Sequence, residues 1–211
     1  MTPLFPGIEL VRLAGAVPAW HAEVDVRHWR TGCEDVARAG GRLAAFWASD
    51  ERDGNRGFSV SALVVMYEGL VCFQLRLSDR DPTYPDLSDL FACAARMQRA
   101  AFDLVGVRAV APAGRTLDSR AWLRHGAWPG DRFPLRKEFE LAHRFPPDTD
   151  HYPFVRVEGE GVHEIPVGPV HAGTIEPGHF RFSIVGEKIL RLEERLGYKH
   201  KGIEKRFESM M

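Results

Sequence analysis

The first half of the chain contains three apolar, β-rich segments separated by short turns, and this pattern constrains the fold more than any other feature. Residues 42–48 and 58–67 combine aromatic and β-branched side chains, and residues 70–77 continue in the same way. A polar stretch at residues 49–57 and the dipeptide Glu68–Gly69 separate them, as is typical of turns between antiparallel strands. The sequence therefore predicts an antiparallel meander.

Two helices are predicted on either side of this meander. Residues 31–39 favour a helix that ends at Gly40–Gly41, after a short strand at residues 22–26. A second helix is predicted to start at residues 85–89, where an Asp or a Ser can cap it, and to end at Gly106. Its apolar stripe consists of Leu87, Leu90, Phe91, Ala94, Met97, Ala101 and Leu104. These elements indicate an α+β fold, a small antiparallel or mixed sheet with packed helices.

The last 60 residues have a different character, because glycines arrive at close intervals. Residues 180–185 and 188–192 predict a β-hairpin, and residues 199–207 predict the start of a helix. A segment with so few core positions hardly folds as an independent domain. We therefore expect this incomplete hairpin-plus-helix segment to need another protein surface on which to fold. The glycines are Gly159, Gly161, Gly168, Gly173, Gly178 and Gly186.

Residues 144–150 carry two prolines and two aspartates and predict a linker. The sequence therefore predicts a first domain at residues 1–145 and a second segment at residues 151–211.

Composition limits the kinds of partner. The chain has 28 Lys and Arg against 29 Asp and Glu, a net charge of -1, which argues against a general nucleic-acid binder. No apolar run approaches the roughly 18 residues that span a bilayer, so we expect any membrane association to come through partner subunits. Three separated cysteines, Cys33, Cys72 and Cys93, favour reduced thiols in a cytoplasmic protein rather than disulfides or a CxxC metal site.

One Gly- and Pro-rich loop, residues 168–182, concentrates groups that could carry chemistry. His171, Glu176 and His179 could ligate a metal, move protons or line a pocket. A structural loop whose imidazoles bond backbone carbonyls explains the same residues, and their spacing matches no zinc-ligand signature. A further alternative is a free-standing metal-binding protein that uses His163, His171 and His179 as ligands.

Two other charged stretches have simpler explanations. At residues 198–205, Glu204 stands between lysines on a predicted short helix, which is typical of a solvated face. At residues 133–139, basic residues lie between aromatics, a pattern that packing and surface charge explain.

Two stretches of the first domain resemble the 30 kDa subunit family of respiratory complex I. Residues 84–107 resemble that family's helix, and Arg132–Phe139, which reads Arg-Phe-Pro-Leu-Arg-Lys-Glu-Phe, is similar to its signature His-Pro-Leu-Arg-Lys-Asp-Phe. The chain departs from the family at residues 98–102, where Gln, Arg and Ala replace acidic residues. The resemblance implies the same fold and contacts with other complex subunits.

The tail resembles the start of the complex I 49 kDa subunit and of nickel–iron hydrogenase large subunits. The matching stretches are residues 168–171, residues 176–182 and residues 197–205. The Glu-Pro-Gly-His version favours the hydrogenases, and the fusion of both parts in one chain resembles the large subunits of complex I-like, group 4 hydrogenases of the formate hydrogenlyase and hydrogenase-4 type.

The resemblance implies roles for four residues of the tail. Glu204 corresponds to a carboxylate that relays protons near the metal, the catalytic candidate. His179, with His171 and Glu176, belongs to the loop that lines the active-site cavity, which in complex I carries a quinone-binding histidine. An ungapped match places Pro177 at that histidine's position.

The nickel–iron centre of that family needs four cysteine thiolates from two CxxC motifs, and this chain has none. We therefore expect a sequence truncated before the first motif, no metal or cofactor bound by these residues, a nickel–iron centre in the full-length protein, and no activity of the chain alone.

The expected function is a large-subunit fragment of a membrane-associated oxidoreductase complex of the hydrogenase type. It would dock the iron–sulfur small subunit and other complex I-like subunits, at the cytoplasmic face of the inner membrane. The alternative is a non-catalytic assembly or quinone-module subunit of an NADH dehydrogenase-like complex.

Overall fold

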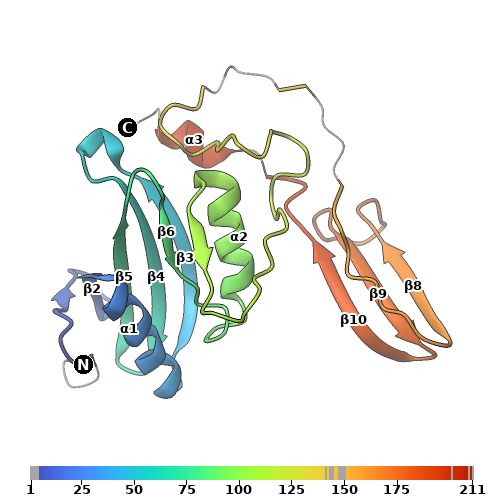
Figure 1. Ribbon diagram of the computed structural model, residues 1–211, viewed down its shortest axis with the longest axis horizontal. Coiled ribbons are helices and arrows are strands. Elements are labelled where there is room, and N and C mark those ends of the chain that lie inside the picture. The colour runs from blue at the N-terminus through green and yellow to red at the C-terminus, as the bar shows by residue number, and fades with distance from the viewer. Residues whose placement is uncertain are drawn as a thin grey trace. The chain divides into compact units, whose positions relative to one another are not determined.

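The computed structural model describes residues 5–140, 142, 145–146, 151–200, 202–208 and 210. The chain divides into two compact units (Figure 1). The first unit comprises Met1–Ser119 and Asp131–Glu140, and the second comprises Arg120–Gly130 and Leu141–Met211. Most of the predicted linker, residues 144–150, lies outside the described residues, so the predicted boundary between residues 145 and 151 stays a prediction.

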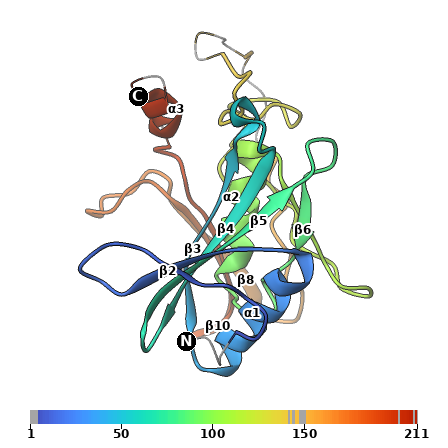
Figure 2. The same ribbon diagram turned by 90° about the vertical axis from the view of Figure 1, so that its left-hand side faces the viewer.

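A five-stranded mixed sheet forms the centre of the first unit, with the strand order β1-β2-β5-β4-β3. Its strands β2, β3, β4 and β5 are labelled in Figure 2. All neighbouring strands run antiparallel except β2 and β5, which are parallel. The meander of β3, β4 and β5 confirms the prediction for residues 42–77. The strands are β1 (Val11–Arg12), β2 (Ala19–Val24), β3 (Arg42–Asp50), β4 (Phe58–Met66) and β5 (Gly69–Leu77).

The two faces of this sheet differ because successive side chains of a strand point to opposite sides. On one face, Phe46, Ala62 and Phe73 lie opposite one another across β3, β4 and β5, and all three are buried. On the other face, Ser61 lies opposite Gln74, whose neighbours include His21 at 3.2 Å. The mixed α+β fold therefore has one apolar core on one side of the sheet.

Helices α1 (Val26–Arg38) and α2 (Ala94–Val105) bury their apolar stripes in that core. Trp29 of α1 is fully buried, packs edge-on against Phe46 at 6.2 Å, and donates to the Pro85 carbonyl at 3.1 Å. The shorter elements are the 3-10 helix η2 (Arg52–Gly54) and the parallel strands β6 (Thr83–Pro85) and β7 (Arg108–Val110).

Both predicted helix starts differ from the structure. Helix α1 begins earlier than residue 31, because the Asp25 carboxylate accepts from the His28 N–H at 2.8 Å and caps the helix there. Helix α2 begins at Ala94, later than the predicted start at residues 85–89. The carboxylate of buried Asp86 accepts from the Ser88 N–H and from the Gln98 amide, so this segment forms turns before the helix begins.

The segment Arg132–Phe139 is clamped onto the first unit by polar contacts from several elements. Arg136 donates to the Val105 carbonyl at 2.8 Å and stacks over Phe133 and Phe58. The backbone N–H of Lys137 donates to the buried carboxylate of Asp50 at 3.0 Å. These side chains are therefore structural anchors in this unit, as the packing explanation predicts.

The second unit contains an antiparallel three-stranded sheet with the order β10-β9-β8. Gly186, at a φ of 55°, turns the chain between β9 and β10 and confirms the predicted hairpin. A short helix, α3 (Ile203–Glu208), follows within the predicted residues 199–207 and one residue beyond. The strands are β8 (Val162–Val167), β9 (His179–Val185) and β10 (Lys188–Arg195).

Candidate functional site

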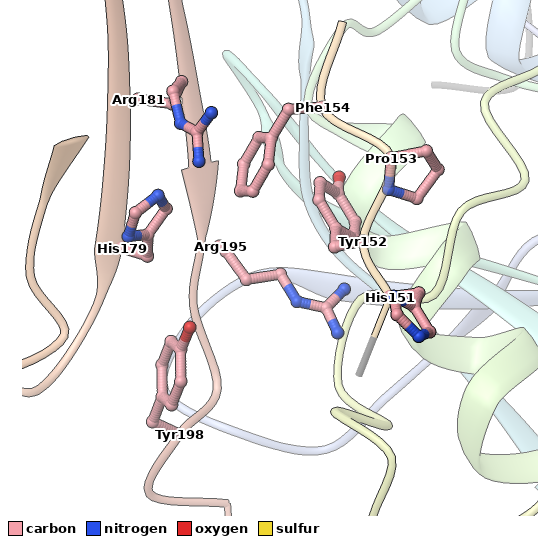
Figure 3. A pocket seen from close by; sticks show the side chains of 8 residues that line it. All are labelled: His151, Tyr152, Pro153, Phe154, His179, Arg181, Arg195 and Tyr198. Atoms are coloured by element: carbon pink, nitrogen blue, oxygen red, sulfur yellow. The ribbon is translucent and has the colours of Figure 1, made fainter. Parts of the chain in front are cut away.

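A pocket of about 550 Å³ lies in the second unit, between the sheet and an extended strap formed by residues 151–155 (Figure 3). The lining residues of the sheet are basic, whereas those of the strap are mainly aromatic. The pocket is lined by His151, Tyr152, Pro153, Phe154, His179, Arg181, Arg195 and Tyr198.

Stacking between arginines and aromatic rings holds the strap over the sheet. The guanidinium of Arg195 lies 4.3 Å from the centroid of the Tyr152 ring, and that of Arg181 lies 4.5 Å from the centroid of Phe154. The Tyr152 and Phe154 rings also contact each other edge to face at 4.7 Å. Cation–π contacts of this kind contribute most where the cation is shielded from water, and Arg195 is only 1% exposed.

A buried carboxylate, Glu193 of β10, ties three segments together. It accepts from Arg120 at 2.8 Å and from the backbone N–H of Val155 at 2.6 Å. Burial alone would raise the pKa of Glu193, but the hydrogen bonds from Arg120 and Val155 lower it, so the group is ionised at neutral pH. Arg120 also donates to the Pro153 carbonyl at 3.0 Å, which fixes the start of the strap.

His179, the first residue of β9, is one of the residues that line the pocket. Its Nδ1 lies 3.0 Å from the Gly168 carbonyl and therefore donates to it. Its Nε2 is buried and has no hydrogen-bond partner among the described residues. The ring packs on Phe154 at 5.2 Å. The backbone-bonded imidazole of the structural explanation is thus present.

His171 and Glu176 lie in the loop before β9. The Nδ1 of His171 accepts from the Gly173 N–H at 3.1 Å, so its buried Nε2 carries the proton. A side chain on Gly168 would contact the His171 ring, so both histidines lie around this glycine. Glu176 is exposed to solvent.

Glu204 lies apart from the pocket residues, in α3. Its carboxylate accepts from His200 at 3.1 Å and is half exposed. Partial burial opposes ionisation, but hydrogen bonds from its own backbone N–H and from His200 lower the pKa of Glu204. In this chain Glu204 is therefore an ionised acceptor, and the relay role stays a prediction.

The family model for the 30 kDa subunit of respiratory-chain NADH dehydrogenase matches residues 22–145, more than half of the chain. The chain belongs to this family. The match includes strands β3, β4 and β5, both long helices and the clamped segment Arg132–Phe139, so the predicted resemblance is confirmed.

Curated relatives of this 30 kDa-family chain include hydrogenase subunits. Formate hydrogenlyase subunit 5 of Escherichia coli is 32% identical over 82% of this chain and 31% of its own length. Hydrogenase-4 component G of the same organism is 33% identical over 81% of this chain and 31% of its own length. The C/D subunit of NADH-quinone oxidoreductase from Phocaeicola vulgatus is 31% identical over 64% of this chain and 28% of its own length. The alignments thus span less than a third of these relatives.

A solved structure shows the same fold. A chain of the membrane-bound sulfane sulfur reductase, described as an archaeal respiratory membrane complex, matches with a TM-score of 0.50 and 16% identity. The match covers 70% of this 30 kDa-family chain and 92% of that chain. In the described part of the present chain, no helix is long and apolar enough to span a membrane.

The cysteines of the 30 kDa-family chain do not fit a nickel–iron centre. Burial raises the pKa of Cys33 to about 12 and also raises that of Cys72, so both are thiols rather than thiolates at neutral pH. Cys93 is exposed and lies on a third segment. Within the described ranges, no three His, Cys, Asp or Glu side chains are grouped to hold a metal.

The sheet of the second unit has one apolar face that the described residues leave partly exposed. Ile165, Phe182 and Leu192 lie side by side across β8, β9 and β10, and Ile165 and Leu192 are about 45% exposed. Val167 continues the face at 41% exposed. Surfaces of this kind mark interaction sites in proteins.

The strap and its anchors were not predicted from the sequence. Arg195 lies in a charged run that predicts solvent exposure, yet it is among the most buried residues. The only sequence signal was the pair of aromatics at Tyr152 and Phe154 beside a proline. Arg120 and Arg195, which stack on Tyr152, are far from it in the sequence, so no local sequence periodicity could identify them.

Proposed function

We propose that this chain is the docking part of the large subunit of a complex I-like, nickel–iron hydrogenase-type oxidoreductase. The observation that carries the proposal is the extent of the hydrogenase alignments. They cover more than four fifths of the chain, whereas the 30 kDa family model covers only residues 22–145. The relatives therefore share the order of the two parts, not only the first.

The role within the complex follows from the surfaces and from the cysteines. The first unit would dock the iron–sulfur small subunit, and the apolar face around Leu192 would pack against the rest of the catalytic domain or a neighbouring subunit. Because the cysteines present do not fit the metal centre, its thiolate ligands would come from other residues. Attachment at the cytoplasmic face of the inner membrane would occur through partners. Glu204 is the proposed proton relay of the assembled enzyme.

The alternative is a non-catalytic assembly or quinone-module subunit of an NADH dehydrogenase-like complex. The similarity to the C/D subunit of NADH-quinone oxidoreductase favours it, although that alignment covers less of the chain.

Affinity purification of the chromosomally tagged gene product, with its associated proteins, tests the proposal. Nickel and iron are measured in the purified complex, together with hydrogen evolution from a reduced dye. Nickel with hydrogen evolution supports the hydrogenase role. Iron without nickel supports the NADH dehydrogenase-like alternative. A chain that purifies alone, with neither metal, contradicts both.

A further inference from the structure

The carboxylate of Glu204 accepts a hydrogen bond from one other side chain of the described residues, that of His200. The Nε2 of His200 lies 3.1 Å from Oε1 of Glu204. Because an ionised carboxylate can only accept hydrogen bonds, Nε2 carries the hydrogen, and Nδ1 of the neutral ring keeps a lone pair. The pair therefore joins a carboxylate to an imidazole whose second nitrogen can take up a proton.

The backbone around His200 holds the ring beside the first turn of α3. The backbone N–H of His200 donates to the Gly197 carbonyl at 3.0 Å. Gly202, with a φ of 64°, turns the chain between the ring and the helix, a conformation that favours glycine. The side chain of His200 is 19% exposed and that of Glu204 is 51% exposed. The ring is thus held in place and still reached by water.

We propose that His200 passes protons to Glu204 in the assembled enzyme, as the outer member of a two-residue proton relay. The proposal rests on the function proposed above, because it extends the relay role of Glu204 by one group.

The transfer needs no reactant other than water. A proton from water binds the Nδ1 lone pair of His200, and the ring becomes an imidazolium. The N–H bond at Nε2 then breaks, and its proton forms an O–H bond with Oε1 of Glu204. Once Glu204 has released this proton, uptake of a proton at Nε2 and loss of the one at Nδ1 restore the starting ring. Imidazole suits this role because it titrates near neutral pH.

A surface ion pair that only stabilises the start of α3 explains the same contact. Such exposed pairs contribute little to stability. On this explanation any hydrogen-bond donor at residue 200 serves equally well, whereas proton transfer needs a group that titrates. His200→Gln separates the two explanations, because glutamine keeps an N–H donor but cannot take up a proton.

The first test measures the pair in the full 211-residue chain. The hydrogen bond from His200 lowers the pKa of Glu204. We therefore expect the carboxyl-carbon NMR signal of Glu204 to titrate at a higher pH in His200→Phe than in the unsubstituted chain. An unchanged titration would show that the pair does not form in solution and would overturn the proposal.

The second test uses the native complex, purified with the substituted chain. We expect His200→Gln to lower hydrogen evolution from a reduced dye about tenfold or more at unchanged nickel content, and free imidazole to restore part of the rate. His28→Gln is the matched control, because His28 makes a similar exposed pair with Asp25 at 3.0 Å in the first unit. If His200→Gln does not assemble, His200→Asn replaces it.

Each outcome decides the proposal. Slow turnover in His200→Gln that imidazole restores, with His28→Gln fully active, supports the relay. Full turnover in His200→Gln, or a loss that imidazole does not restore, overturns the relay and leaves the proposed function standing. An unsubstituted complex without nickel and hydrogen evolution contradicts the proposed function, and the relay is then overturned with it.

Discussion

Single buried charges hold the family signature in place, and Asp50 is the clearest case. Its carboxylate is fully buried and accepts from Arg52 at 2.6 Å and from the Lys137 N–H at 3.0 Å. Burial acts to raise its pKa, but these donors prevail and lower the pKa of Asp50 to about 2. Asp50 thus fastens Arg132–Phe139 to the end of β3 most strongly while it is ionised.

The pH dependence of stability follows from that shift. Because the pKa is lower in the folded state, the contribution of Asp50 is complete above about pH 4 and is lost as the pH falls toward 2. We expect Asp50→Asn to remove about 2 kcal/mol from the unfolding free energy at pH 7 and to flatten its acid dependence. Urea unfolding between pH 2 and 7 measures both effects.

Asp53→Asn is the control for that experiment. The Asp53 side chain is 67% exposed, and its carboxylate lies 3.5 Å from the Nζ of Lys137, a separation at which a solvated ion pair contributes little. If the unfolding free energy of Asp50→Asn depended on pH as that of the unsubstituted protein does, other carboxylates would be responsible for the acid dependence.

At the level of elements, the end of α2 is shaped to receive the same segment. Gly106 has a φ of 79°, and a side chain there would lie 2.7 Å from both Arg136 and Phe133. We expect Gly106→Ala to destabilise the protein by about 2–4 kcal/mol, because backbone strain and a steric clash add. Gly114→Ala separates the two effects, since Gly114 has a φ of 84° but open space around it. Urea unfolding measures both variants, and an equal loss of unfolding free energy in Gly106→Ala and Gly114→Ala would exclude a contribution from the clash.

The elements that the sequence predicts well are those with a local cause. The aromatic and β-branched segments with their turns in residues 42–77 and the turn at Gly186 predicted β3–β5 and the β9–β10 hairpin correctly, because composition and turn chemistry act over a few residues. The start of α2 was wrong because Asp86 and Gln98 bond across 12 positions. Of the site, His179 was singled out from the sequence, but the stacking of Arg195 on Tyr152 depends on the folded strap.

The second unit has a partly exposed apolar sheet face, and the proposed docking role places this face against a partner. We expect Leu192→Glu to lower incorporation of the chain into its native complex at least about tenfold, because a charge would be buried at the contact. Lys188→Glu is the control, since Lys188 is an exposed polar residue of the same strand. The yield of associated proteins per tagged chain measures this, and circular dichroism checks that both variants fold. Equal yields would place the contact elsewhere.

The second unit contains a segment that the sequence places inside the first domain. Residues Arg120–Gly130 belong to it, and Arg120 bonds both Glu193 of β10 and the Pro153 carbonyl of the strap. Removal of one partner of a buried ion pair leaves an uncompensated charge, so Arg120→Ala should destabilise this unit by about 3 kcal/mol. Hydrogen exchange measured by mass spectrometry should then accelerate in β9 and β10 while β4 and β5 stay protected.

Arg156→Ala is the control, because the Arg156 and Glu158 side chains of that ion pair are 82% and 73% exposed and their pairing contributes little. If hydrogen exchange in β4 and β5 accelerated to the same extent in Arg120→Ala, the two units would unfold together.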